Sequence, residues 1–264
     1  TAYGFIRFAI PLFPDATAKA VPLISILAII GIIYGALVSM VQEDVKKLVA
    51  YSSVSHLGFV MLGLFALTLT SMQGALIQMV NHGLSTGALF LLVGVIYERA
   101  HTRQISDFGG LSKMMPLYAV FFMIVALSSI GLPGLNGFVG EFLILVGTFL
   151  SEHPYAKVYA IFAGSGVIFA AVYLLWMYQR VFFGPVKEKV AQFKDLNLRE
   201  VIYLAMVLVF IIWIGIHPST FLKKSEATIK KLLEQVEERR ITQKELENKW
   251  AKVFKTEQIR KIFE

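Results

Sequence analysis

The sequence predicts an all-α, polytopic membrane protein: a transmembrane helix bundle with one broken helix, followed by a charged helical tail. Hydrophobic residues make up 56% of the 264 residues and charged residues only 16%. The mean hydropathy of +0.67 lies well outside the range of soluble domains. Several apolar runs reach the roughly 20 residues that cross a bilayer core. One run is interrupted by glycine and proline and then carries a carboxylate.

The apolar runs predict six membrane spans. A short opening piece, Tyr3–Phe13, is closed by Pro14 and Asp15. The spans then follow at Val21–Val41, Leu48–Leu69, Gly74–Tyr97, Pro116–Leu150, Tyr159–Phe183 and Val201–Ile216. Pro116–Leu150 is treated as one interrupted span, because each half has only about 17 residues and no charge separates the halves.

The linkers predict the orientation of the bundle. Lys and Arg crowd the linkers at 42–47, 98–113 and 179–200, whereas those at 68–73 and 151–157 carry few. The positive-inside rule therefore places the first set on the cytoplasmic side. The chain after His217 and Pro218 is expected to leave on the opposite face.

The net charge of +7 does not indicate a nucleic-acid partner. Residues 219–264 hold 12 Lys/Arg against 8 Asp/Glu and thus carry +4 of it. The dispersed remainder is typical of loops at a membrane surface, without the basic stripe that nucleic acid requires. The absence of cysteine excludes disulfides, Cys-ligated clusters and thiolate nucleophiles.

The tail is expected to be a separate amphipathic unit, residues 219–264, behind a transmembrane domain of residues 1–218. Thr242 and Glu245 have capping-box spacing, and an apolar stripe follows at Leu246, Trp250 and Val253. We expect helices that lie on the membrane or on their own domain. The alternative is a docking helix for a neighbouring subunit.

Three ionisable residues stand inside the predicted spans away from their ends: His56, His82 and Glu141. Such groups are costly at membrane depth unless they are paired or hydrated, so each is a functional hypothesis. His56 shares a helical face with Ser52, one turn earlier. The alternative for His56 is a neutral imidazole that is hydrogen-bonded to a carbonyl group or a serine.

His82 lies near the centre of its span in a polar stripe with Gln78, Ser85 and Thr86. Four polar side chains on one face of an apolar helix can hold a file of water. Simple helix adhesion is the alternative, because Gly83 and Gly87 would permit close packing of another helix.

The broken helix carries Gly131, Pro133 and Gly134, with Glu141 two turns further on. Unpaired backbone groups at membrane depth are tolerated only where they face protein or a water-filled cavity, so the break predicts a hydrated pocket on the bundle interior. Burial disfavours a charged carboxylate and a nearby cation favours it, so Glu141 could load and release a proton. The alternative is a carboxylate that merely ties two helices together.

Lys46 stands at the cytoplasmic start of a span, where such lysines act as snorkelling anchors or form a proton-uptake cluster leading to Ser52 and His56. The sequence shows no phosphate-binding glycine loop and no metal-ligand spacing, so we expect no metal site.

Three long motifs, "QEDVKKLVAYSSVSHLGFVMLGL", "QGALIQMVNHGLSTGALFLLVGVIYERAHTR" and "LSSIGLPGLNGFVGEFLILVGTF", resemble the antiporter-like proton-channel subunits of respiratory complex I. These subunits are related to subunits of Mrp-type cation/proton antiporters and membrane-bound hydrogenases. Histidine in "NHGLS" and glutamate in "GFVGEF" is similar to the M-type, fourth-subunit branch of NADH:quinone oxidoreductase. The resemblance spans residues 1 to about 222.

The resemblance implies two inverted five-helix repeats, each with one broken helix, joined by a central axis of buried ionisable residues and water. It implies that His56 and His82 belong to this axis, that Glu141 is the terminal site on the second broken helix, and that Lys46 matches the lysine of the family's "DIKR" loop. The family's first repeat is absent, so we expect the second half only. The N-terminus, which starts inside an apolar stretch without methionine, likewise indicates a fragment or a processed product.

The function expected from the resemblance is proton translocation within a redox-driven NADH:quinone oxidoreductase of an energy-transducing membrane, either a prokaryotic plasma membrane or an organelle inner membrane. Electron chemistry would occur on other chains, so no cofactor is expected on this one, and its partners would be other membrane subunits and the lipid bilayer. Two alternatives stay open: a sodium/proton antiporter module, which would need clustered carboxylates, and a structural subunit without an active channel.

Overall fold

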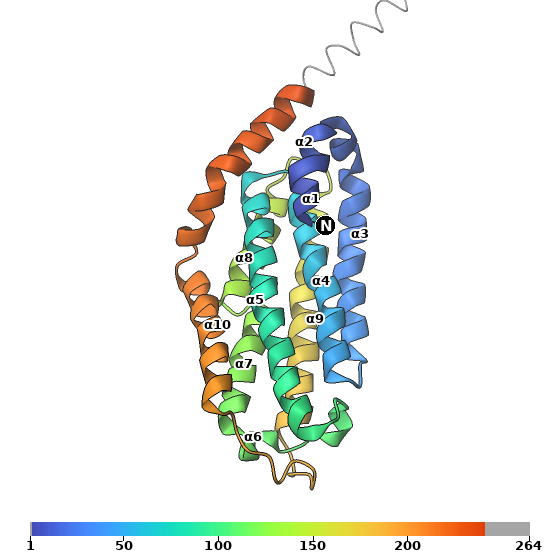
Figure 1. The fold of residues 1–264 in the computed structure, drawn as a ribbon. Helices are drawn as coiled ribbons and strands as arrows, with labels where there is room; N and C mark the ends of the chain where they lie inside the picture. The colour runs from blue at the N-terminus through green and yellow to red at the C-terminus, as the bar shows by residue number, and fades with distance from the viewer. Residues whose placement is uncertain (1, 241–264) are drawn as a thin grey trace, which may run out of the picture.

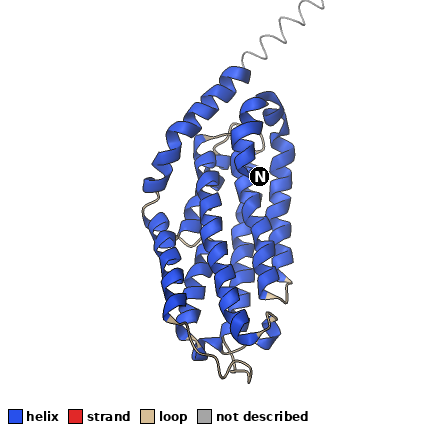
Figure 2. Ribbon diagram, in the orientation of Figure 1, coloured by secondary structure: helices blue, strands red, loops and turns tan. Residues whose placement is uncertain are grey.

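The computed structural model describes residues 2–240 and shows one bundle of roughly parallel and antiparallel helices (Figure 1). Apart from an isolated bridge between Asp44 and Gln104, the regular elements in this range are helical (Figure 2). Short helical turns open the chain at Ala2–Gly4 (α1), Phe5–Ala9 and Ile10–Leu12 (α2). The main elements are α3 (Pro14–Met40), α4 (Val45–Phe65), α5 (Leu69–Ala100), a turn at Ile105–Asp107, α6 (Leu111–Met114), α7 (Pro116–Ile130), α8 (Asn136–Phe149), α9 (Ala156–Phe182), α10 (Leu198–Ile216) and a helix at 219–240.

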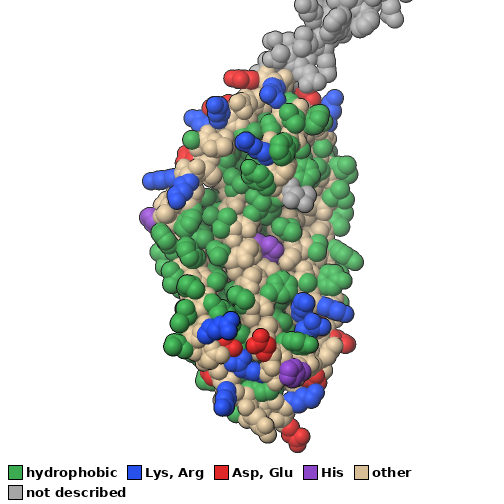
Figure 3. Space-filling model, viewed as in Figure 1, with side chains coloured by type: hydrophobic (Ala, Val, Ile, Leu, Met, Phe, Trp, Pro, Cys, Tyr) green, Lys and Arg blue, Asp and Glu red, His purple; other side chains and the backbone are tan. Residues whose placement is uncertain are grey.

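Five of these helices are long and apolar enough to cross a membrane, and α7 and α8 are shorter apolar helices. The predicted all-helical multi-span fold is therefore confirmed. Large apolar side chains stay exposed along the outer face of α3, among them Leu23, Ile30 and Tyr34. Such a face is suited to lipid. Hydrophobic side chains likewise cover much of the middle of the molecule, with charged side chains gathered nearer its two ends (Figure 3).

Several helix boundaries differ from the predicted ones because capping signals extend the helices. The opening turns end at Leu12, next to the predicted end at Phe13. The helix of the first span, however, begins at Pro14 and not at the predicted Val21, because a proline at the first helical position loses no hydrogen bond. Thr68 caps α5 in a capping box with Ser71, so this helix starts five residues before the predicted Gly74. Asn197 caps α10 in the same manner with Glu200.

The three basic linkers meet at one end of the bundle, as the orientation argument requires. Across the first two linkers, the backbone amide of Val45 donates to the backbone carbonyl of Arg103, and that of Ile105 donates to the backbone carbonyl of Glu43. The Gly110 amide donates to the backbone carbonyl of Phe183 in the third linker. Arg99 forms a bidentate ion pair with Glu200, at 2.7 and 3.0 Å, and ties the end of α5 to the start of α10. At the other end Thr68 donates to the Gly147 carbonyl and Ser151 to that of Ala66.

The helix at 219–240 packs against the bundle. Phe221 and Leu222 lie against a small core of Ile77, Val139 and Ile214, and Ile229 and Val236 are buried in the cluster that α3 and α4 form with the opening turns. This part of the tail therefore contacts its own domain. The predicted capping box at Thr242 and the stripe of Leu246, Trp250 and Val253 lie outside the described residues.

Candidate functional site

The predicted break in the helix is present between α7 and α8. Gly131 ends α7 with a φ of +85°, and the amides of Gly131 and Leu132 donate to Ser128 and Leu127. This is the Schellman arrangement, which needs a residue in the left-handed region and therefore favours glycine. The chain then runs without helix to Asn136, the first residue of α8.

Glu141 lies on the second turn of α8 and is 3% exposed. Its Oε1 is 3.1 Å from His56 Nδ1 on α4 and accepts a hydrogen bond of 3.3 Å from Gln78 Nε2 on α5. A Cβ on Gly131 would come within 2.8 Å of Glu141 Oε2, so the glycine leaves room for the carboxylate. Burial of a carboxylate is costly unless it is paired and hydrogen-bonded, and the two neighbours meet this requirement.

His56 contacts Glu141 and also lies close to His82. Its second nitrogen, Nε2, is buried without a hydrogen-bond partner among the described residues, and the side chain lines a small cavity together with His82. The volume of about 10 Å³ is the size that accepts a single water molecule. The two imidazole rings are 5.6 Å apart between centroids, and Thr86 Oγ1 lies 2.9 Å from His82 Nδ1.

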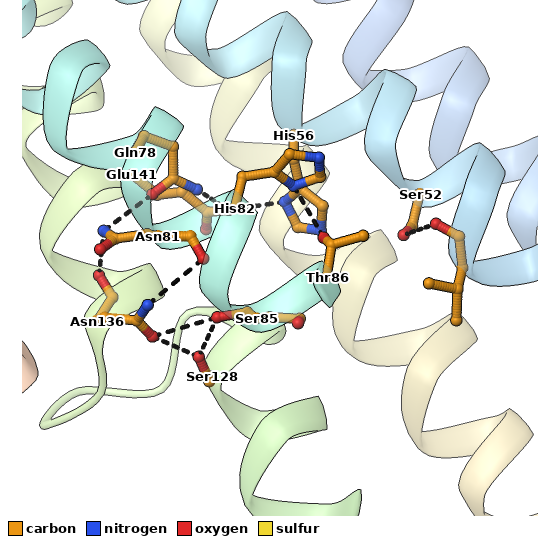
Figure 4. A network of polar contacts seen from close by, with 12 residues as sticks. Ser52, His56, Gln78, Asn81, His82, Ser85, Thr86, Ser128, Asn136 and Glu141 are labelled. Atoms are coloured by element: carbon orange, nitrogen blue, oxygen red, sulfur yellow. Dashed lines mark hydrogen bonds and ion pairs between the residues drawn. The ribbon is translucent and has the colours of Figure 1, made fainter. Parts of the chain in front are cut away.

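A second set of polar groups extends from Gln78 to the break. Asn81 Nδ2 donates to Gln78 Oε1 and, at 2.6 Å, to the backbone carbonyl of Asn136. The Asn136 side chain contacts the hydroxyl groups of Ser85 and Ser128, which are 2.7 Å from each other. These contacts connect α5 with α7 and α8 directly beside the break (Figure 4).

The structure thus brings together most of the residues that the sequence singled out. His56, His82, Gln78, Ser85, Thr86 and Glu141 share one region between α4, α5 and α8 (Figure 4). The sequence analysis missed Asn81, Ser128 and Asn136. Signals for two of them were present: Asn81 follows Gln78 by three residues and so shares its helical face, and Asn136 directly follows the break.

Ser52 and Lys46 do not join this network. Ser52 is buried, but its hydroxyl donates to the Val49 carbonyl at 2.7 Å, and it stands apart from the other polar side chains (Figure 4). The side chain of Tyr173 on α9 is fully buried, and its hydroxyl group lies near Ser52. Lys46 is exposed in the first turn of α4.

The expectation that the break faces only the bundle interior is wrong in part. Gly131 faces Glu141, but Leu132, Pro133 and Gly134 are exposed on the surface of this chain. Gly131 and the buried Asn136 hold the two ends of the loop against the interior, so the residues between them lie further out. The inner edge of the loop rests on α10, because Gly134 O lies against Gly215.

Within residues 2–240, His, Asp and Glu side chains do not gather in groups of three or more that could hold a metal ion. The site offers one carboxylate, two imidazoles and a set of amides and hydroxyls that can donate and accept hydrogen bonds.

The fold is that of a multi-span helical membrane protein with a cluster of buried polar side chains between its helices. The protein is similar to a chain of "Respiratory complex I from Thermus thermophilus with bound NADH", with 34% identity and a TM-score of 0.84 over 89% of this chain and 49% of that one. It also shares its fold with a chain of the Mrp complex from Dietzia, at 18% identity and a TM-score of 0.78, over 89% of this chain and 52% of that one.

The family described as "NADH:quinone oxidoreductase/Mrp antiporter, TM" matches residues 1–168, and the chain belongs to this family. Relatives include NADH-quinone oxidoreductase subunit M of Rhodobacter capsulatus, 46% identical over 82% of this chain and 42% of that protein. NADH-ubiquinone oxidoreductase chain 4 of Marchantia polymorpha is 42% identical over 88% of this chain and 46% of that protein. The chain thus spans less than half the length of the curated relatives it matches.

Proposed function

We propose that this chain forms part of a proton-translocating membrane subunit of an NADH:quinone oxidoreductase and supplies a segment of its proton path. The observation that carries the proposal is the Glu141–His56 pair: a buried acid and a buried base, 3.1 Å apart, beside a broken helix. The high identity to subunit M and chain 4 proteins supports the same assignment.

The geometry allows a proton to move between Glu141 and His82 in short steps. Transfer between Glu141 Oε1 and His56 Nδ1 interconverts an ion pair and a neutral pair across one hydrogen bond. The hydrogen bond from Gln78 to the same oxygen stabilises the carboxylate form. The free His56 Nε2 can exchange its proton with a water in the adjoining cavity, which His82 also lines.

Lys46 and Ser52 take a peripheral place in this proposal. Lys46 is exposed at the basic end of α4. Ser52 is buried and lies about one and a half turns further along the same helix. We assign Lys46 to proton uptake at the cytoplasmic surface and Ser52, with Tyr173, to the region between that surface and His56. The polar residues Gln78, Ser85 and Thr86 line the path.

The chain itself performs no electron transfer in this proposal and needs no cofactor. NADH oxidation and quinone reduction take place on other subunits, and the chain is held among other membrane subunits within the energy-transducing bilayer. The broken helix, Gly131, Pro133 and Gly134, keeps Glu141 accessible to the path by ending α7 beside the carboxylate.

A sodium/proton antiporter module is the second candidate, since the family also includes Mrp antiporter subunits. A sodium site needs several oxygen ligands, whereas the groups bound to Glu141 are a histidine nitrogen and an amide nitrogen. These nitrogen groups are suited to a proton-transferring carboxylate and not to a sodium site. A structural subunit without an active channel is the third candidate, and the following experiment separates all three.

Replacing His56 with glutamine is expected to lower the number of protons translocated per electron roughly 10-fold, because glutamine can hydrogen-bond to Glu141 but cannot carry a proton at neutral pH. Proton uptake and NADH oxidation would be measured together in proteoliposomes that contain the assembled full-length complex. His217→Gln, at an exposed histidine outside the network, is the matched control and should leave the ratio unchanged.

Unchanged translocation in His56→Gln would show that His56 is not a relay and would favour the structural subunit. Translocation that stops when sodium is removed from the wild-type preparation would instead favour the antiporter.

A further inference from the structure

A cavity at the basic end of the bundle, away from the polar network, has a volume of about 570 Å³. It lies between the linker at 105–109 and the end of α9. Its charged lining residues are Arg180, Lys187 and Glu43, and its apolar lining residues include Ile105, Phe108 and Phe183. The cavity thus combines positive charge with apolar walls at the predicted cytoplasmic surface.

Arg180 is the central feature of this cavity. The Cζ atom of its guanidinium group lies over the indole ring of Trp176, 3.9 Å from the ring centroid. Two of its nitrogens, Nε and Nη2, are buried and have no hydrogen-bond partner among the described residues. A guanidinium with unused buried donors is costly, and it suits an anion with several oxygens, such as a phosphate group.

Lys187 is the second basic residue that lines the cavity. Its Nζ contacts the Ser106 carbonyl, which uses one of its three donors and leaves the others for a second acceptor. Lys189, the next lysine of this linker, already pairs with Asp107 at 3.6 Å. Glu43 is the single acidic residue of the lining, and it is exposed. The net charge of the lining is therefore positive, because Arg180 and Lys187 outnumber it.

The outer face of α9 beneath Arg180 is apolar and exposed. Val172 and Trp176, one turn apart on α9, are 44% and 45% exposed, and Phe183, the residue that follows the helix, is 54% exposed. Because Arg180 lines the cavity and lies over Trp176, the cavity that favours a phosphate adjoins a surface that favours acyl chains. A free phosphate ion would make no use of this surface.

We propose that this cavity binds an anionic phospholipid, with its phosphate between Arg180 and Lys187 and its acyl chains along the exposed apolar side chains of Val172, Trp176 and Phe183. Basic pockets between transmembrane helices on the cytoplasmic side are suited to such headgroups. The bound lipid would also satisfy the guanidinium donors of Arg180 and hold the 105–109 linker against α9.

The test uses photoactivatable phospholipids in membranes that contain the full-length protein in its assembled complex. A phosphatidylglycerol probe and a phosphatidylcholine probe with identical photoreactive acyl chains would be compared, and adducts mapped by peptide mass spectrometry. Adducts on the α9 peptide that contains Trp176 are expected mainly with the phosphatidylglycerol probe. Arg180→Gln and Lys187→Gln should each lower that yield about five-fold.

Lys113→Gln is the matched control, since Lys113 is an exposed lysine at the same end that does not line the cavity. It should leave the yield unchanged. Lys187 lies in a surface linker, so its variant reports on the site even where Arg180→Gln disturbs packing against Trp176. Equal yields from the two probes, equal losses in all three variants, or full competition by millimolar inorganic phosphate would each overturn the lipid assignment.

Discussion

Replacing Glu141 with glutamine is expected to lower proton translocation by the assembled complex at least roughly 10-fold while folding and assembly persist. Glutamine keeps the volume of the side chain, and its amide oxygen can still accept the hydrogen bond from Gln78. It cannot accept or release a proton at neutral pH. Proton uptake per electron in proteoliposomes, measured beside the amount of assembled complex, gives the result.

Glu98→Gln serves as the matched control, because Glu98 lies exposed at the basic end of α5. It should translocate protons like the wild type. A combination of Glu141→Gln with His56→Gln should be little worse than either change alone, since both remove the same transfer step. Normal translocation in Glu141→Gln, or fully additive losses in the double variant, would contradict a shared relay.

Replacing Gly131 with alanine is expected to impair proton translocation several-fold even though Glu141 is intact. The substitution has two physical effects. The φ of +85° costs an alanine roughly 1–2 kcal/mol, and the new Cβ would come within 2.8 Å of Glu141 Oε2, so the carboxylate must move away from His56 and Gln78. Proton translocation and thermal unfolding in detergent would both be measured.

Gly134→Ala separates these two effects. Gly134 has a φ of +94°, so alanine is strained there to a similar degree, but no atom outside its neighbours lies within 4 Å of the added Cβ. Both variants should lose stability, Gly131→Ala more because of the added clash with Glu141, and only Gly131→Ala should lose translocation. A loss of translocation in both would attribute the effect to the shape of the break and not to the displaced carboxylate.

The sequence could predict the helical class, the break and the buried ionisable residues, because each depends on local pattern. Glycine, proline and glycine within four residues interrupt a helix wherever it is placed. An acidic residue within an apolar run can be recognised from the sequence alone. The fold and the positions of His56, His82 and Glu141 therefore followed from hydropathy and residue type.

The pairing of Glu141 with His56 could not be predicted in this way. The two residues are 85 positions apart, and their contact depends on how α4, α5 and α8 are rotated against one another, which hydropathy does not specify. Neither could the outward arch of Leu132–Gly134, since exposure depends on how α8 leaves the break.

The most direct test of the proton-relay account is infrared difference spectroscopy of the assembled complex during NADH-driven turnover. The account predicts a carboxyl C=O band that changes as Glu141 gains and loses its proton, that shifts in heavy water, and that is missing in Glu141→Gln but present in Glu98→Gln. A wild-type difference spectrum that Glu141→Gln leaves unchanged in the carboxyl region would show that this residue keeps one protonation state and would contradict the account.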